Sequence, residues 1–226
     1  GLAPDWTEDW IASFAAGLAH DCRKYGVTLS GGDTFRAFGG PVISITAWGE
    51  IEPDKYRSRL GAHVGDRLFV SGSIGDAALG LKVRQGDAAY RASPGARDLL
   101  TSYLLPDPPV AFAPLIAAYA TASMDISDGF VGDLEKLARA SQVDFSVKLQ
   151  HLPFSRPVME AIELPGALET ALTGGDDYQF LFTVPVKNLH EFRKALVAIS
   201  ADATELGIAR KGDGKVSIVG ADGNHL

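Results

Sequence analysis

The chain has a single cysteine, Cys22, among its 226 residues. One cysteine can form neither an intrachain disulfide nor a cysteine-rich zinc site, so the sequence excludes a disulfide scaffold and favours a reducing, cytoplasmic setting. The sequence also lacks a run of about 20 apolar residues, which a membrane-spanning helix needs, and a basic-then-apolar signal peptide. We therefore expect no membrane partner.

Positive charge is also scarce. The chain has 21 Lys and Arg against 28 Asp and Glu, a formal net charge of −7. Nucleic-acid-binding proteins usually carry a basic face, so we expect no nucleic-acid partner. The 46% of hydrophobic and 22% of charged residues are typical of a globular protein. An acidic globular protein suits a metal cation, or an anion that binds together with one.

Several common catalytic motifs are absent. The sequence contains no P-loop G-x-x-x-x-G-K-[ST], no G-x-G-x-x-G that opens a helix after a strand, no G-x-S-x-G serine and no H-E-x-x-H. Its five histidines are scattered along the chain. These absences argue against a P-loop enzyme, a dinucleotide-binding enzyme, a serine hydrolase and a zinc protease.

The N-terminal part predicts a helix followed by two strands. Asp5 and Glu8 form a capping-box pattern at the start of the helix, and Gly26 suits the left-handed cap at its end. Residues 27–29 are expected to form a short strand. Residues 42–51 alternate apolar and polar side chains, which is typical of a half-buried strand.

A polar, turn-rich stretch then predicts a domain boundary near residue 52, so that residues 1–52 and 53–226 form separate domains. In the second domain, strands and helices interleave without the even alternation of a doubly wound sheet, which predicts an α+β fold with mixed sheets packed against helices. Its expected elements are a strand, glycine loop and helix within 67–83, helices at 94–104, 109–121 and 187–199, and strands at 145–149 and 215–219.

Negative charge gathers at residues 124–134, MDISDGFVGDL, where a strand is expected to precede a helix. A helix N-terminus attracts anions, but Asp125 and Asp128 would repel a phosphate unless a cation lay between them. Mg²⁺, held by one or two carboxylates and by phosphate oxygens, meets this requirement. Alternatively, Ser127 or Asp128 only caps the helix, and the motif alone leaves both interpretations open. Asp133, further into the helix, is expected to face solvent. The buried apolar stripe of the helix is expected to consist of Phe130, Leu134, Leu137 and Ala138.

Two further motifs combine glycine with aspartate. SGGDT, residues 30–34, presents Asp33 after a predicted strand, and TGGDDYQF, residues 173–180, presents Asp176 and Asp177. Each motif by itself is also ordinary turn chemistry. Three such motifs in one acidic chain favour metal-dependent phosphate chemistry over three coincident turns.

Four segments, in this order, resemble the thiamine-monophosphate kinase family: GVTLSGGDT, RLGAHVGDRLFVSGSIGDAALGL, MDISDGFVGDL and LTGGDDYQFLFTVP. That family belongs to the superfamily of aminoimidazole-ribonucleotide synthetase, and the resemblance runs over nearly the whole chain. It implies a homodimer of two-domain α+β subunits that transfers the γ-phosphate of ATP to thiamine phosphate with Mg²⁺. It also implies that residues 1–52 are the remainder of an ATP-binding and dimerisation domain, and that a C-terminal tail is missing.

The roles of individual residues follow from the same resemblance. It implies that Asp33, Asp125 and Asp128 bind Mg²⁺, that Gly32, Asp33, Arg59 and Ser127 contact ATP, and that Asp176 meets thiamine phosphate. No residue is expected to act as a catalytic base, because the accepting phosphate has a second pKa of about 6 and is largely deprotonated near neutral pH. The aspartates would act by positioning and neutralising the phosphates.

The chain departs from the family pattern at several places. The family motif Gly-Gly-Glu-Asp-Tyr-Glu is GGDDYQ here, with Asp176 and Gln179 in place of two glutamates, and the family's RPxPR is LPDPP. The Gly-Asp-Asp and Thr-Asp metal-binding segments and the C-terminal aromatic residue of the family are not in the chain. Two alternatives therefore stay open: another ATP-dependent synthase of the superfamily, or a degenerate member that only binds nucleotide.

Overall fold

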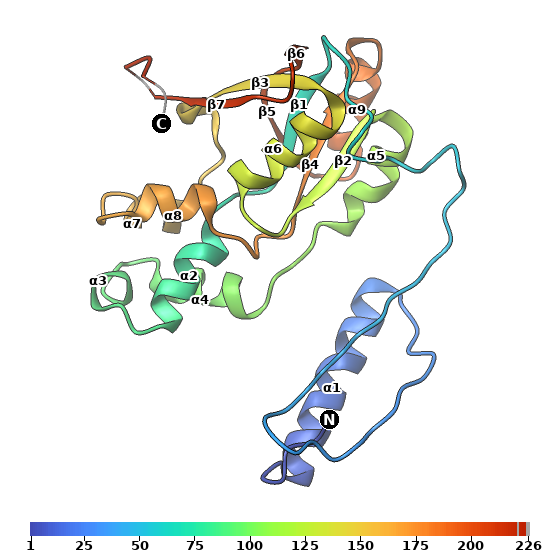
Figure 1. Cartoon of the computed structure of the whole chain (residues 1–226), viewed down its shortest axis with the longest axis vertical. Coiled ribbons are helices and arrows are strands. Elements are labelled where there is room, and N and C mark those ends of the chain that lie inside the picture. The colour runs from blue at the N-terminus through green and yellow to red at the C-terminus, as the bar shows by residue number, and fades with distance from the viewer. Residues whose placement is uncertain (221, 225–226) are drawn as a thin grey trace. The chain divides into compact units, whose positions relative to one another are not determined.

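The computed structural model describes residues 1–220 and 222–224. The chain divides into two compact units, Gly1–Ile51 and Glu52–Leu226, and the smaller unit is drawn in blue in Figure 1. Among the described residues, no helix combines the length and the apolar character that crossing a membrane requires.

The smaller unit is built around α1 (Glu8–Tyr25). The Oγ1 of Thr7 accepts the N–H of Trp10 at 3.2 Å, so Thr7 is the N-cap. The capping box predicted for Asp5 and Glu8 is therefore wrong, because the helix begins at Glu8 and Asp5 lies two residues before the cap. Gly26 ends the helix in the left-handed conformation, with φ at 65°, as its position predicts.

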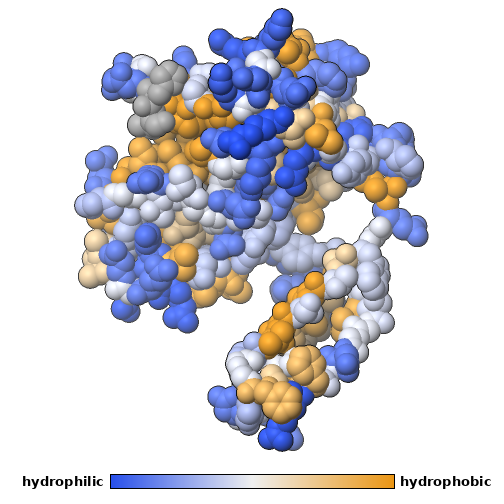
Figure 2. Space-filling model, viewed as in Figure 1, coloured by the Kyte–Doolittle hydropathy of each residue, from blue (hydrophilic) through white to orange (hydrophobic). Residues whose placement is uncertain are grey.

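The two strands predicted in this unit do not form. Residues 27–29 and 42–51 belong to no strand; Val42 exchanges backbone hydrogen bonds with Gly1, and Leu2 and Arg36 make an isolated bridge. Alternation of apolar residues predicts a strand only where a neighbouring strand accepts its hydrogen bonds. Without one, the apolar side chains remain exposed, as with Ile45 and Trp48. Figure 2 shows apolar residues on the surface of this unit.

The larger unit alternates helices and strands. Its α-helices are α2 (Asp76–Arg84), α3 (Ala88–Arg91), α4 (Ala96–Leu104), α5 (Ala113–Tyr119), α6 (Phe130–Ser141), α7 (Arg156–Ala161), α8 (Ala167–Thr173) and α9 (Leu189–Ala198). Its strands are β1 (Arg67–Ser71), β2 (Ala122–Ile126), β3 (Val143–Lys148), β4 (Gln179–Val184), β5 (Ala203–Ile208), β6 (Arg210–Lys211) and β7 (Val216–Val219). Short 3-10 turns lie at Val110–Phe112, Leu149–His151 and Val186–Asn188.

Four strands form an antiparallel sheet in the order β2-β4-β1-β5. Side chains alternate between its faces: Leu68 and Val70 of β1 pack in a core with α6 and β3, whereas Phe69 packs with α5 and α9. Helices therefore cover both faces of the sheet (Figure 1). On α6, the predicted apolar stripe is fully buried, and it consists of Phe130, Leu134, Leu137 and Ala138.

A second sheet and a helical layer complete the unit. β3 pairs antiparallel with β6 and parallel with β7, so this sheet is mixed. Helices α2, α3, α4, α7 and α8 share a separate apolar core that includes Leu79, Leu99 and Val158. They gather at one end of the larger unit (Figure 1). The predicted α+β fold of mixed sheets packed with helices is confirmed; strands β5 and β6 and helices α3 and α8 were not predicted.

Two loops distant in sequence cross each other at the end of β2 and the start of β4. The N–H of Tyr178 donates to the carbonyl of Ile126 at 2.8 Å, and the N–H of Asp176 donates to the carbonyl of Ser127 at 3.1 Å. At Gly175 the backbones are so close that an added Cβ would lie 2.1 Å from the carbonyl oxygen of Ser127. Only glycine fits at this crossing.

Asp177, in the same loop, caps α2 from a distance. Its Oδ2 accepts the N–H of Gly75 at 2.6 Å and its Oδ1 accepts the N–H of Ala77 at 3.1 Å. The carboxylate thereby satisfies N–H groups that a helix start leaves free. The glycine loop 72–75 therefore forms a strand-to-helix turn, and the cap of its helix is supplied by Asp177 of the motif TGGDDYQF.

Gly175→Ala should destabilise the larger unit by about 1–3 kcal/mol, because the new methyl group would force the two loops apart. Urea unfolding measures this change. Gly132→Ala is the matched control: it lies within α6 with open space around its Cβ, and there alanine should stabilise the helix by about 0.5–1 kcal/mol. Equal effects of the two substitutions would contradict the close crossing.

Asp177→Asn should change how stability depends on pH. Burial, helped by the charges of Asp76 and Asp176 and opposed by the two N–H bonds, raises the pKa of Asp177 to about 6 from 3.8. The carboxyl group of Asp177 therefore binds its proton more tightly in the folded state than in the unfolded state. Its contribution to the free energy of unfolding is greatest below pH 3.8 and falls as the pH rises toward 6.

Relative to Asp177→Asn, the wild-type protein should therefore lose about 2 kcal/mol of unfolding free energy between pH 4 and pH 7. Urea unfolding of both proteins across this range measures the difference, in which the contributions of all other titrating groups cancel. A difference that stays constant with pH would contradict the raised pKa.

Candidate functional site

Asp125 and Asp128 lie at the edge of the four-stranded sheet. Asp125 is in β2, opposite Phe180 of β4, and Asp128 is in the loop that leads from β2 to α6. Both residues are exposed. Their carboxylates are therefore open to a ligand from the solvent.

The start of α6 is arranged differently from the prediction. Its N-cap is Gly129, with φ at 117°, so neither Ser127 nor Asp128 caps the helix. Instead, the Oδ2 of Asp133 accepts the N–H groups of Ser127 at 3.0 Å and Asp128 at 2.9 Å. The expectation that Asp133 faces solvent is also wrong: it is 1% exposed, because its carboxylate turns back to satisfy the loop before the helix. Within the described residues, the carboxylate of Asp128 accepts no backbone N–H and accepts the ammonium group of Lys136.

Lys136 adds a positive charge to this loop. Its Nζ pairs with Asp133 at 2.8 Å and also donates to Asp128. Hydrogen bonds from Lys136 to Asp128 and Asp133 raise the pKa of its ammonium group. The lysine offsets part of the negative charge and connects an exposed carboxylate to a buried one.

Asp176 lies beside the same loop, because its N–H bonds to the carbonyl of Ser127. The hydroxyl of Tyr178 donates to Asp176 at 3.1 Å. This hydrogen bond, together with burial and the charges of Asp176, Asp125 and Asp128, raises the pKa of Tyr178. The structure therefore brings the acidic motif of residues 124–134 and that of residues 173–180 together around Tyr178.

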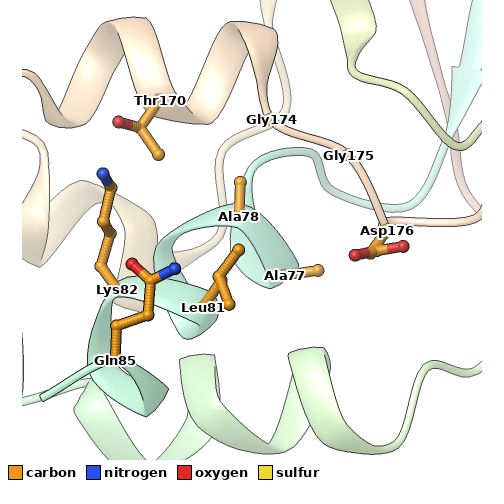
Figure 3. A pocket seen from close by; sticks show the side chains of 9 residues that line it. All are labelled: Ala77, Ala78, Leu81, Lys82, Gln85, Thr170, Gly174, Gly175 and Asp176. Carbon is orange, nitrogen blue, oxygen red and sulfur yellow. The ribbon is translucent and has the colours of Figure 1, made fainter.

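A small hollow of about 190 Å³ adjoins Asp176, between α2 and α8. Figure 3 shows Lys82 and Gln85 of α2 and Thr170 of α8 around it, with Asp176 at one end beside the start of α2. Asp176 thus lies where the hollow meets the acidic loops. A ligand in contact with Asp176 would also lie near the α2 start.

The donor chemistry of Asp125 and Asp128 fits Mg²⁺. Both supply exposed carboxylate oxygens, and Mg²⁺ usually binds one or two carboxylates together with waters and substrate phosphates. Among residues 1–220 and 222–224, no group of three or more acidic, histidine or cysteine side chains is placed to hold a metal ion. The two aspartates could therefore supply part of a Mg²⁺ coordination shell, which phosphate oxygens would complete.

The three remaining predicted residues belong to other segments of the chain. Gly32 and Asp33 belong to the smaller unit, where the N–H of Thr34 bonds to the carboxylate of Asp33 at 2.8 Å. The carbonyl of Arg59 accepts the hydroxyl of Ser141, the last residue of α6. The length of α6, 12 residues or about 18 Å, separates that point from Asp128. The roles predicted for these three residues remain predictions.

Sequence reasoning missed four residues of the cluster: Asp133, Lys136, Asp177 and Tyr178. The spacing of Asp133 and Lys136, three residues apart on a helix, is a signal for an ion pair. The long-range contacts of Asp177 and Tyr178 left no local signal, because Asp177 bonds to a loop about 100 residues away and the N–H of Tyr178 bonds to a loop about 50 residues away.

Two protein-family profiles together match most of the chain. The profile described as "AIR synthase related protein, C-terminal domain" matches residues 63–220, and "AIR synthase related protein, N-terminal domain" matches residues 2–51. The thiamine-monophosphate kinase of Haemophilus influenzae is 33% identical over 205 residues, which cover 90% of this chain and 61% of that protein. The chain thus spans about three fifths of the length of such relatives.

Solved structures are similar as well. The thiamine-monophosphate kinase from Stenotrophomonas maltophilia K279a superposes with a TM-score of 0.81 at 28% identity, over 99% of this chain and 71% of the other. A structure described as "AaThiL complexed with AMPPCP and TMP" gives 0.77 at 29% identity, over 100% and 69%. With the profile match over residues 63–220, these likenesses show that the chain belongs to the AIR synthase related protein family.

Proposed function

We propose that the protein containing this chain transfers the γ-phosphate of ATP directly to thiamine phosphate, in line and with Mg²⁺, to give thiamine diphosphate. The observation that carries the proposal is the convergence of the loop bearing Asp125, Ser127 and Asp128 with the loop bearing Asp176. The similar protein complexed with AMPPCP and TMP supports it, since that pair combines an ATP analogue with the proposed acceptor.

The residues of the chain suit a reaction that needs positioning and charge neutralisation more than proton transfer. Asp176 would orient thiamine phosphate, and Ser127 would contact the nucleotide at the same loop crossing. The acceptor oxygen is already deprotonated near neutral pH. No general base is therefore required, and the cluster offers carboxylates and a lysine in place of an activated histidine or serine.

Asp125 and Asp128 would hold Mg²⁺ through their exposed carboxylate oxygens. When bound, the ion would supply positive charge that neutralises the phosphate oxygens of the nucleotide. Lys136 would share Asp128 with the ion, and the buried Asp133 gives Lys136 a second partner when Asp128 turns toward the ion.

The remaining predictions belong to the same proposal. Gly32, Asp33 and Arg59 would contact ATP, and Asp33 would add a third carboxylate to the metal. The protein would be a cytoplasmic homodimer. Residues 1–52 would contribute to nucleotide binding and dimerisation, and residues 53–226 would carry Asp176 and the acidic loop.

An assay of the complete gene product with ATP, MgCl₂ and thiamine phosphate tests the proposal. Release of ADP should require thiamine phosphate, stop with a chelator, and match the formation of thiamine diphosphate. ATP hydrolysis that depends on a carbonyl substrate would favour the alternative synthase of the superfamily. Tight nucleotide binding without turnover of either kind would favour the degenerate, nucleotide-binding alternative.

Asp128→Asn in the complete gene product should lower turnover at least about 100-fold, because it removes a carboxylate proposed to hold Mg²⁺, whose positive charge would neutralise the phosphates in the transition state. Steady-state kinetics at saturating MgCl₂ measure the loss. Asp202→Asn is the control, since Asp202 is exposed in the turn between α9 and β5. A rate near that of the wild type for Asp128→Asn would contradict the metal role.

A further inference from the structure

The cap that Asp177 provides is unusual in its origin. Gly75, the N-cap residue of α2, has no side chain to cap the helix. The carboxylate that replaces it comes from 102 residues later in the chain. Asp177 is 8% exposed, and it bonds to the N–H groups on either side of Asp76. A local cap would fix the helix start alone, whereas this one also fixes a second loop.

The second loop is the one that holds Asp176. Asp176 and Tyr178, which flank Asp177, have φ values of 71° and 50°. Residues other than glycine adopt this left-handed region at a cost of about 1 kcal/mol or more, so the surroundings must hold them there. Three hydrogen-bonded contacts do so: Asp176 to Ser127, Tyr178 to Ile126, and the carboxylate of Asp177 to the start of α2.

The α2 side of this contact is itself held firmly. The carboxylate of Asp76 accepts the hydroxyl of Ser73 at 2.7 Å and the hydroxyl of Ser155. At the adjoining strand ends, the hydroxyl of Ser71 donates to the side chain of Gln179 at 2.9 Å. The turn at residues 72–75 is therefore held by Asp76 as well as by Asp177. Asp177 connects the loop that bears Asp176 to this turn.

We propose that Asp177 is a positioning residue: by bonding to the N–H groups of Gly75 and Ala77, it sets the conformation in which Asp176 meets the substrate. This inference rests on the proposed phosphorylation of thiamine phosphate. It assigns the two adjacent aspartates different tasks. Asp176 contacts the substrate, and Asp177 acts on the substrate only through Asp176.

Burial supports this division of tasks. Loss of solvation raises the pKa of Asp177, and the negative charges that face it are Asp76 at the start of α2 and Asp176 in its own loop. Asp177 also lines a second pocket, beside α4, whose other acidic residues are Asp76 and Asp107. A carboxylate in this setting is suited to two fixed N–H donors and is poorly placed to meet a phosphate directly.

A double-mutant cycle on the complete gene product tests the proposal, with Asp177→Asn, Asp176→Ala and the double variant. Asp177→Asn should raise the KM for thiamine phosphate about tenfold, since misplacement of a contact residue by about 1 Å has effects of this size or larger. The KM for ATP should change less. In the Asp176→Ala background, Asp177→Asn should change the KM for thiamine phosphate by no more than about twofold. The effects of two substitutions do not add when one residue acts only through the other.

Hydrogen exchange gives a readout that does not depend on activity. The amides of Gly75 and Ala77 should exchange faster in Asp177→Asn and keep the wild-type rate in Asp176→Ala. Ala77→Pro removes the second donor at a helix position that tolerates proline and leaves Asp177 intact. It should raise the KM in the same direction, which keeps the proposal testable if Asp177→Asn folds poorly.

Asp87→Asn is the matched control, because Asp87 caps α3 by accepting the N–H of Ala89 at 3.0 Å without touching the acidic loops. Its kinetics should stay within about twofold of the wild type. The positioning role would be overturned if Asp177→Asn raised the KM for thiamine phosphate equally with Asp176 present and with Asp176→Ala. It would also be overturned if Asp177→Asn left this KM unchanged. A wild-type protein that does not phosphorylate thiamine phosphate would instead overturn the proposed function, and the positioning role with it.

Discussion

The arrangement of the acidic residues depends on the close backbone crossing between residues 126–129 and residues 174–178. Two N–H groups from the second loop bond to two carbonyls of the first, at a point where Gly175 leaves no room for a side chain. These bonds place motifs that are about 50 residues apart in sequence within reach of one ligand. Without them, each motif would be an ordinary acidic turn at a strand end.

Local features of the larger unit could be predicted because they follow from local chemistry. The strand, glycine loop and helix within 67–83 and the apolar stripe of α6 were recognisable from spacing alone. The strands predicted at 27–29 and 42–51 do not form, because the alternation of apolar and polar residues in a segment does not reveal whether a partner strand is present. The strand β5 was not recognised from its own residues, and it exists because β1 supplies its hydrogen bonds.

For the candidate site, the residue types were predictable and their partners were not. Asp125, Asp128 and Asp176 were named from glycine–aspartate motifs, and the structure places these three near one another. Asp133 was misjudged because helix position alone suggests exposure, whereas its carboxylate serves two N–H groups that precede the helix. Asp177 could not be assigned a task from sequence, since its donors lie beyond any local window.

The order of strands in the four-stranded sheet has a consequence for biosynthesis. Strands β1 and β2 both pair with β4, and β1 pairs further with β5. Until the ribosome has passed residue 179, where β4 begins, β1 and β2 have no partner in this sheet. Such long-range pairing folds slowly and exposes apolar strand faces until it closes. Leu68, Phe69 and Val70 of β1 therefore stay without their sheet partners until β4 and β5 have been synthesised.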